Sequence, residues 1–447
     1  MAPRLGIFNL NWQVYPSMRN DPHLKRGYYP SQPLMKPEEW QNLMNYYLAT
    51  APDSLPPQQR DHPIKNDLVN FQVLTPSVVG HTPTTCFIQV DTTRLPHSVL
   101  QSDIFRKLIT RYDSKLQPVD SVSFIYGPIL DIDFRASPAV ATNIGQLNPT
   151  NARLGRLQRF VVDARGKMQL DTTLKIDSLA RPVQSISVDL NGDGKADELV
   201  CEFGHLTGAL SWYENQGNDH YLRHVLRATP GAIKAYVRDY NHDGLPDLFV
   251  LFAQGEEGIF LFTNKGHGQF DERELLQFPP SYGSSYFEMD DFNKDGFPDI
   301  VYTCGDNADF SVELKPYHGV YIFLNDRHWN FNQKYFFPIN GCYKAMARDF
   351  DGDGDLDLAV ISFFADYEKQ PEEGFVYLEN TGDFNFLPHS TPATQHGRWL
   401  TMDVGDLDGD GKPDILLGNF SVAPTFIKPK FDFKNGPGFL LLKNVSK

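Results

Sequence analysis

Asp349-Phe-Asp-Gly-Asp-Gly-Asp-Leu-Asp357 is the clearest copy of the nine-residue acidic loop that decides the fold of this chain. Four more copies occur at Asp189–Asp197, Asp239–Asp247, Asp291–Asp299 and Asp406–Asp414. Every copy has carboxylate or amide oxygens at loop positions 1, 3, 5 and 9, and Gly at position 6. Carboxylates held this close together repel one another unless a cation lies among them. The five copies therefore predict five cation sites.

The predicted ligands are all oxygen atoms, with no His or Cys at a ligand position, and this donor set favours Ca²⁺ over zinc or copper. Glycine at position 6 permits the sharp turn that brings the carbonyl of position 7 into the shell. Up to five Ca²⁺ are expected, and the candidate metal ligands are Asp189, Asn191, Asp193, Lys195, Asp197, Asp239, Asn241, Asp243, Leu245, Asp247, Asp291, Asn293, Asp295, Phe297, Asp299, Asp349, Asp351, Asp353, Asp355, Asp357, Asp406, Asp408, Asp410, Lys412 and Asp414.

The first five loop positions also resemble an EF-hand, which requires a bidentate Glu at position 12 and flanking helices. Position 12 is apolar or aromatic in every copy: Val200, Val250, Tyr302, Val360 and Leu417. Each loop is followed by a short run of strand-forming residues, such as Leu358-Ala-Val-Ile361. The loop is therefore predicted to join two strands, with the Asp at position 9 completing the shell.

The loops begin 50, 52, 58 and 57 residues apart, and periods of this size are typical of four-stranded propeller blades. A second marker follows each loop, a predicted third strand that runs from Gly to Asn. Its copies are Gly208–Asn215, Gly258–Asn264, Gly319–Asn325, Gly374–Asn380 and Gly438–Asn444. Each unit is thus expected to contain a strand, the calcium loop, a strand, a connection, a strand, a turn and a strand.

Two earlier units carry weaker signals. Pro118–Phe134 is interpreted as the start of a blade, and Asp131 precedes Asp189 by 58 residues. The turn after Asp131 lacks the Gly and the last two acidic ligands, so no metal is assigned to it. Phe71–Thr110 holds further apolar stretches. The expected fold is all-β, a seven-bladed β-propeller of four-stranded antiparallel blades with a small N-terminal α-helical segment.

On the acidic loops and the Gly-to-Asn strands, the chain resembles the FG-GAP/VCBS-repeat β-propellers, the family that includes the head of integrin α-subunits. The resemblance covers roughly residues 68–447. It implies a seven-bladed disc in which the calcium loop links the first two strands of a blade on the lower face. The first two blades depart from the pattern, and the glycine-rich fingerprints of the integrin copies are incomplete.

Residues 1–67 differ in character. Lys36–Thr50 is predicted to form an amphipathic helix, and Pro52 and Pro56-Pro57 end it and begin a linker. With Met1–Ile7, this segment resembles the C-terminal half of a small c-type cytochrome domain, in which Met35 would occupy the place of a haem ligand. The alternative is a helical cap on the propeller. The signature for haem attachment is absent, so no covalent haem is expected.

Composition limits the partners. The net charge is −15, and the sequence shows no basic stretch, which argues against a nucleic-acid partner. No run of 18 apolar residues predicts a membrane span. Calcium loops with few protein ligands usually need millimolar Ca²⁺, so we expect a periplasmic, cell-surface or secreted protein. No signal peptide opens the chain, which favours an N-terminally truncated copy. The four cysteines are expected to be buried thiols.

Two basic pairs precede acidic loops: Lys234 with Arg238, and Lys344 with Arg348. The first interpretation is a structural ion pair with the neighbouring acidic cluster, and the second is a lining of the central channel. The histidines beside turns, His205, His242 and His318, are expected to be exposed or hydrogen-bonded.

The clue to function lies in the connections between second and third strands, on the face opposite the calcium loops. Three are long: Cys304–His318, Phe364–Glu373 and Gly418–Pro437. They carry Asp306, Asp309, Tyr317, Asp366, Tyr367, Phe426, Lys428, Lys430 and Phe431. Long loops on one face of a rigid scaffold are typical of binding sites, and these three connections are expected to expose their aromatic and charged groups.

The first hypothesis for function is a non-enzymatic scaffold that binds a protein or carbohydrate on the face opposite the calcium loops. The alternative is an enzyme or a redox module, either polysaccharide-cleaving or the propeller partner of a c-type cytochrome. Its site would lie at the upper mouth of the channel. Basic, His or Tyr side chains that converge there would favour the alternative, whereas a broad aromatic and polar rim would favour binding.

Overall fold

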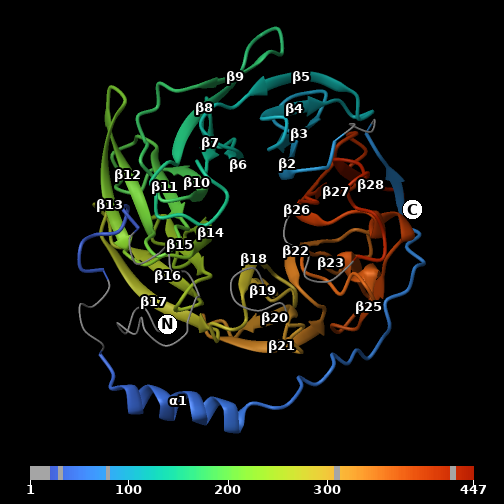
Figure 1. The fold of residues 1–447 in the computed structure, drawn as a ribbon. Coiled ribbons are helices and arrows are strands. Elements are labelled where there is room, and N and C mark those ends of the chain that lie inside the picture. Colours follow the sequence, from blue (N-terminus) through green and yellow to red (C-terminus); the bar gives the residue numbers. More distant parts are fainter. Residues whose placement is uncertain (1–20, 29–33, 77–80, 307–312, 423–428, 447) are drawn as a thin grey trace.

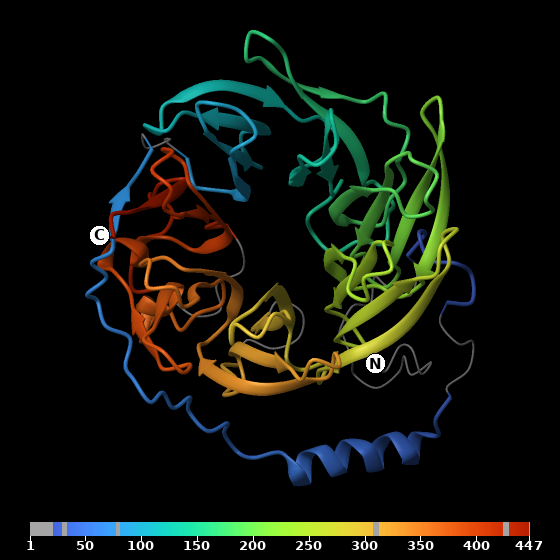
Figure 2. The ribbon, with the colours of Figure 1, turned by 180° about the vertical axis from the view of Figure 1, so that it is seen from behind.

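The computed structural model describes residues 21–28, 34–76, 81–306, 313–422 and 429–446. Within them, 28 strands form seven four-stranded antiparallel sheets that are arranged as blades around a central axis (Figure 1). The ring is equally clear from behind (Figure 2). The predicted fold class and the blade count of seven are confirmed.

The first two blades are made of β2 (Thr85–Asp91), β3 (Ser98–Asp103), β4 (Leu108–Tyr112), β5 (Pro118–Ser123), and of β6 (Ile129–Asp133), β7 (Ala139–Asn143), β8 (Arg156–Val162), β9 (Met168–Asp171). The next two are made of β10 (Pro182–Val188), β11 (Asp197–Glu202), β12 (Ala209–Gly217), β13 (His220–Arg227), and of β14 (Ala232–Arg238), β15 (Asp247–Phe252), β16 (Gly258–Asn264), β17 (Phe270–Gln277).

The fifth and sixth blades are made of β18 (Ser284–Asp290), β19 (Asp299–Cys304), β20 (Gly319–Asn325), β21 (Phe331–Pro338), and of β22 (Cys342–Arg348), β23 (Asp357–Ser362), β24 (Phe375–Asn380), β25 (Phe386–His389). The seventh is made of β26 (Trp399–Gly405), β27 (Asp414–Asn419), β28 (Phe439–Asn444) and β1 (Phe71–Leu74). Two short 3₁₀ helices, η3 (Pro371–Gly374) and η4 (Pro392–His396), lie beside β24 and before β26.

The ring is closed by strands from opposite ends of the described chain. β1 pairs antiparallel with β28, in a register that runs from Phe71 opposite Asn444 to Leu74 opposite Leu441. The outermost strand of the seventh blade therefore comes from the N-terminal side of the propeller. This pairing ties the first and last segments together, so unravelling from either end must break a sheet.

The boundaries predicted for the first two blades are wrong, although two blades are present. Phe71–Thr110 is not one unit, because β1 belongs to the seventh blade. Pro118–Phe134 spans the last strand of one blade, β5, and the first strand of the next, β6. These blades lack the acidic loop between their first and second strands, and strand-forming residues alone do not show where one blade ends.

The core lies between the faces of neighbouring blades. Second strands are covered on both sides, which explains their continuous apolar runs: β15 is buried at every residue from Asp247 to Phe252. Outer strands face solvent on one side, and β17 accordingly carries charged residues at half of its positions. All four cysteines are buried free thiols on strands, as predicted.

The N-terminal segment begins its regular structure with α1 (Pro37–Thr50), which lies outside the ring (Figure 1). Trp40 on this helix packs against Met35, Leu43 and Met44. The chain then runs along the propeller, where Arg60 donates to the Pro338 carbonyl at 2.7 Å and forms an ion pair with buried Glu373. No helix in the described parts of the chain is both long and apolar enough to cross a membrane.

Candidate functional site

All five acidic loops connect the first and second strands of a blade, as predicted. They follow β10, β14, β18, β22 and β26, so they lie on one face of the ring, here called the loop face. The connections between second and third strands lie on the opposite face, here called the upper face. In each loop the Asp at position 9 is also the first residue of the second strand.

The Asp at position 1 organises the turn. Oδ1 of Asp349 accepts the N–H of Gly352 at 2.8 Å, and Oδ2 accepts that of Gly354 at 3.0 Å. Gly354 has φ +92°, a backbone conformation that residues other than glycine rarely adopt. This explains the Gly at position 6. The same bond to position 6 is present in the other four loops at 2.8–2.9 Å.

The Asp at position 9 is buried in every loop. In the fourth loop Oδ1 of Asp357 accepts the N–H of Asn380 at 2.7 Å, and Oδ2 accepts that of Phe350 at 3.2 Å. Equivalent pairs of bonds occur in the other loops. Burial raises the pKa of Asp357 to about 7 and those of Asp299 and Asp414 to about 6, despite these donors.

Two loops bring three carboxylates together. Oxygens of Asp349, Asp351 and Asp353 lie within 4.8 Å of one another, and so do those of Asp406, Asp408 and Asp414. The other three loops have Asn at position 3, which offers an amide oxygen without charge. An oxygen-only donor set on a tight turn fits Ca²⁺, whose shell of 6–8 ligands would also need main-chain carbonyls and water.

Cationic side chains of the protein reach four of the loops. Lys195 pairs with Asp193 at 2.8 Å, Arg327 with Asp295 at 3.0 Å, and Lys294 with Asp355 at 2.7 Å. Lys443 pairs with Asp408 in the last loop. At position 7 the backbone N–H donates to the Asp at position 5, in all five loops. These contacts reduce the repulsion between the carboxylates.

Around the central channel, side chains of the first strands cap the edge of the next blade. The N–H of Ala235 donates to Gln184, that of Ala347 to Glu288, and that of Val90 to Asp403, at 2.7–2.8 Å. The first strand of a blade lies at the edge of its sheet, so the N–H groups on its unpaired side have no partner within that sheet. Acids and amides on the neighbouring blade supply that partner.

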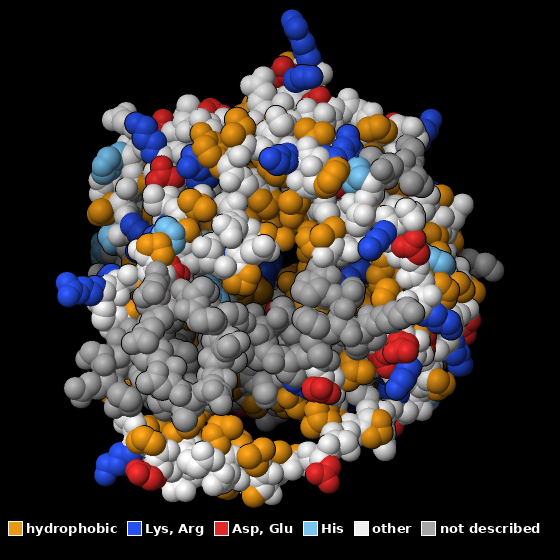
Figure 3. Space-filling view, in the orientation of Figure 1, with side chains coloured by type: hydrophobic (Ala, Val, Ile, Leu, Met, Phe, Trp, Pro, Cys, Tyr) orange, Lys and Arg blue, Asp and Glu red, His pale blue; other side chains and the backbone are white. Residues whose placement is uncertain are grey.

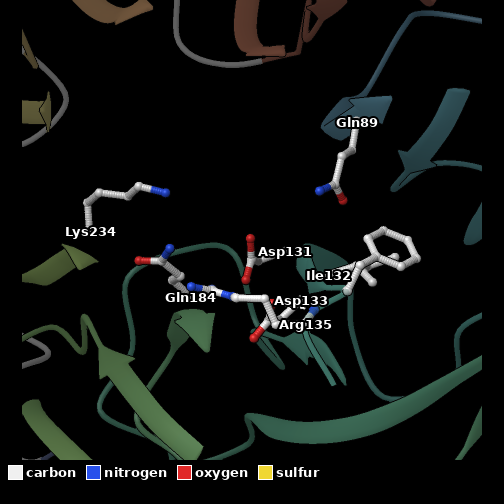
Figure 4. Close-up of a pocket in the computed structure, with 8 residues that line it drawn as sticks. Gln89, Asp131, Ile132, Asp133, Arg135, Gln184 and Lys234 are labelled. Atoms are coloured by element: carbon white, nitrogen blue, oxygen red, sulfur yellow. Dashed lines mark hydrogen bonds and ion pairs between the residues drawn. The ribbon is translucent and has the colours of Figure 1, made fainter. Parts of the chain in front are cut away.

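Of the basic residues that precede the acidic loops, some line the central channel. Arg348 forms an ion pair with Glu288 at 3.1 Å, so the prediction that it pairs with the acidic loop is wrong. Lys344 donates to the Met402 carbonyl at 2.7 Å, and burial lowers its pKa to about 8. Lys234 lines a cavity of about 410 Å³ in the channel (Figure 4).

The long late connections are packed together more than predicted. Asp366 and Tyr367 are buried, which contradicts their expected exposure. The Tyr367 ring lies 4.9 Å from that of Phe433, and its carbonyl accepts the N–H of Lys430 at 3.0 Å. Neighbouring connections thus share a small apolar core of their own. Asp309, Phe426 and Lys428 lie outside the described residues.

The upper face carries exposed apolar residues that were not predicted from the sequence, here called the upper patch: Phe105, Ile125, Tyr126 and Leu154. Phe105 and Ile125 are 69% and 86% exposed. All four lie in connections of the first two blades that the topology places on this face. Hydrophobic side chains gather over these blades in the space-filling view (Figure 3). Apolar residues within short turns were the available signal.

Two of the segments that carry the upper patch are joined by a backbone hydrogen bond. The N–H of Phe124 donates to the Lys107 carbonyl at 3.1 Å, which ties the turn that holds Phe105 to the segment that holds Ile125. Beyond it, the Arg156 guanidinium lies 3.6 Å from the centre of the Tyr126 ring. The patch therefore has aromatic and aliphatic side chains with a basic group at its edge.

His318 corrects a further prediction. It is neither exposed nor hydrogen-bonded through its ring: the side chain is wholly buried, and both ring nitrogens lack a partner among the described residues. Burial lowers its pKa to about 3, so the ring is neutral.

The match to a known family of repeats begins at acidic loops. The FG-GAP-like repeat matches residues 189–250, 239–302 and 349–417. Over 140 residues, 26% of the chain, the sequence is 31% identical to integrin alpha-PS3 of Drosophila melanogaster, of which the match covers 12%. Over 243 residues, 41% of the chain, it is 27% identical to the T-cell immunomodulatory protein homolog of Plasmodium falciparum, of which the match covers 33%. The chain thus spans a third or less of these relatives.

Among solved structures, Saccharomyces cerevisiae Sqt1 is similar with a TM-score of 0.48 and 9% identity, over 86% of this chain and 100% of that one.

Proposed function

We propose that this chain, a β-propeller of FG-GAP-like repeats, is a calcium-stabilised scaffold that binds a protein partner through its upper face. The loop face supplies stability, and the upper patch supplies contact. The observation that carries the proposal is the concentration of large exposed apolar side chains on the face opposite the acidic loops.

The calcium part of the proposal rests on the donor set. Three carboxylate oxygens within 4.8 Å of one another occur in the two loops with Asp at position 3. Such a cluster is costly without a cation, and calcium would offset the repulsion by coordinating the oxygens directly. The loops would then fix the hairpin between the first two strands in five of the seven blades. Sites of this kind suit the calcium concentration outside the cytosol, so we place the protein in the periplasm, on the cell surface or in the extracellular space.

The partner part rests on the chemistry of the upper patch. Large apolar side chains that are exposed together on one face are typical of contact surfaces between proteins. Aromatic side chains and Arg are enriched in such surfaces, and the patch has both in Phe105, Tyr126 and Arg156. A carbohydrate partner would require more hydrogen-bonding groups than the patch offers.

The upper mouth of the channel has a similar character. Leu130, Tyr343 and Leu400, from three first strands, pack in one apolar cluster with Phe363 and Phe420 of the upper connections. This arrangement is closer to a binding rim than to a set of converging acid and base groups.

The test compares two faces of the same protein. The wild-type chain, the double variant Phe105→Ser/Ile125→Ser and the control Leu95→Ser are immobilised and exposed to the extracellular fraction of the source cells. Leu95 is 85% exposed and lies between β2 and β3 on the loop face, so it matches the patch residues in exposure but not in location.

We expect the wild type and Leu95→Ser to retain the same protein and the double variant to lose it, with unchanged melting temperatures for all three. Equal retention by the double variant would contradict the assignment of the upper patch. Release of the bound material by a glycosidase rather than by a protease would identify a carbohydrate partner instead.

A further inference from the structure

The central channel contains a cavity of about 410 Å³ that is lined by the first strands of four neighbouring blades. Its polar lining residues are Gln89 from β2, Asp131, Asp133 and the adjoining Arg135 from the second blade, Gln184 from β10 and Lys234 from β14. Four consecutive blades thus contribute side chains to one space.

Three of these side chains point toward a common space (Figure 4). They are the ammonium group of Lys234, the carboxyl group of Asp131 and the amide of Gln89. Neither the acidic loops nor the upper patch includes any of them.

The polar atoms that face this space are incompletely bonded. Oε1 of Gln89 is buried and has no hydrogen-bond partner among the described residues. Among the described residues, the Lys234 ammonium has no hydrogen-bond acceptor. It lies 5.0 Å and 5.6 Å from the ring centres of Tyr236 and Tyr286. A buried polar atom without a partner is costly unless water or a ligand supplies one.

Only one carboxylate oxygen of Asp131 accepts a hydrogen bond from the described residues. Its Oδ2 accepts the N–H of Ser185 at 3.3 Å, which is the edge-capping role seen around the channel. Its other oxygen remains available on the cavity side. Asp133 differs, because its two oxygens are bonded to the N–H of Ser187 and to Arg135, at 2.7 Å each. Asp133 and Arg135 therefore neutralise each other, whereas Asp131 and Lys234 face the cavity.

This arrangement disfavours a ligand that carries only an anionic group or only a cationic group. A simple anion would be attracted by Lys234 but would meet Asp131 and Gln89 Oε1, two acceptors. A simple cation would be repelled by Lys234. A ligand that combines a carboxylate with an N–H or O–H donor would pair with Lys234 and with the acceptors Asp131 and Gln89 Oε1, both of them when the donor is an ammonium group and one of them when it is a hydroxyl.

We propose that the channel cavity binds a small carboxylate with a hydroxyl or amino group on the neighbouring carbon. Its carboxylate accepts from Lys234. A protonated amino group donates to both Asp131 and Oε1 of Gln89, whereas a hydroxyl, with one hydrogen, donates to one of these two acceptors. The cavity volume fits a small organic molecule and is at the lower end of typical ligand pockets.

The test measures binding to the full chain by saturation-transfer NMR and titration calorimetry. The probes are lactate, with a hydroxyl donor, alanine, with an amino donor, and propionate, with the same carbon count and no donor. We expect lactate or alanine to bind, which distinguishes the hydroxy from the amino source, and propionate to bind at least about tenfold more weakly.

The matched variants are Lys234→Met, which keeps an unbranched side chain one atom shorter and without the charge, and Lys115→Met, at an exposed lysine in the turn between β4 and β5. Binding should weaken about tenfold or more in the first and remain unchanged in the second. If Lys234→Met does not fold, Gln89→Leu serves as the second test. No binding of lactate or alanine, equal binding of propionate, or full binding by a folded Lys234→Met or Gln89→Leu variant would overturn the proposal.

Discussion

Oδ1 of Asp357 accepts the backbone N–H of Asn380 at 2.7 Å and so joins the last residue of an acidic loop to the last residue of the third strand in the same blade. The amide of Asn380 in turn donates to the carbonyl of Leu356, the residue before Asp357, at 3.2 Å. The acidic loop and the Gly-to-Asn strand are therefore two halves of one interaction. This explains why both markers recur with the same period.

Removal of calcium is expected to destabilise the propeller. The carboxylates of each loop repel one another without the ion, and calcium binds only to the folded loops, so it stabilises the native state by mass action. The melting temperature should fall in excess chelator and return when calcium, but not an equal concentration of sodium, is added back. An unchanged melting temperature in chelator would contradict calcium as a structural ion.

The loops are expected to differ in affinity. The last two carry Asp at position 3, whereas the first three carry Asn, and greater ligand charge favours tighter binding. In the first loop, Lys195 also competes for Asp193 through an ion pair at 2.8 Å. Calorimetric titration should show that Asp353→Ala removes a high-affinity site and Asp193→Ala a weaker one. Loss of equivalent sites in both variants would refute the charge argument.

Asn444 is expected to stabilise the junction between the last two blades. Its buried amide donates to the Phe350 carbonyl of the preceding blade at 2.7 Å and to the Pro413 carbonyl at 3.2 Å. Asn444→Ala leaves both carbonyls without this donor and should lower the free energy of unfolding by about 2 kcal/mol. The exposed Asn385 provides the control, since Asn385→Ala should cost about 0.5 kcal/mol or less. Urea titration of both variants measures the difference, and equal midpoints would contradict it.

Glu257 is expected to make stability depend on pH. Burial raises its pKa to about 7, and its Oε2 accepts the hydroxyl of Ser284 at 2.7 Å. In the unfolded chain a Glu has a pKa of about 4.3, so between these values the folded state binds the proton and the unfolded state does not. The contribution of Glu257 is therefore complete below about pH 4.3 and is lost as the pH rises through about 7.

The change should amount to at most about 1.4 kcal/mol per pH unit in that window. Glu257→Gln should reduce the slope by the contribution of Glu257, leave that of groups such as Asp357, whose pKa is also about 7, and be more stable than the wild type at pH 8. Glu274→Gln, at an exposed position of β17, should retain the wild-type profile. A slope that Glu257→Gln leaves unreduced would assign the effect to another group.

The sequence by itself determined the repeated unit. Ligand spacing, the Gly at position 6 and the strand-forming residues after position 9 act within about ten neighbouring residues, so a blade can be recognised from a loop such as Asp349–Asp357. The free buried cysteines and the helix Pro37–Thr50 follow from equally local patterns. Where the loop is missing, in the first two blades, local patterns could not place the boundary between β5 and β6.

Only the tertiary structure decided what ring closure brings together. Phe71 lies opposite Asn444, although almost the whole described chain separates them. Gln89, Asp131 and Lys234 face one cavity because three blades present their first strands to the same axis. Tyr367 is buried because a connection of the next blade folds over it. Contacts within a blade can be predicted from the spacing of residues in the sequence. Contacts between blades depend on the curvature of the whole ring, which no single segment encodes.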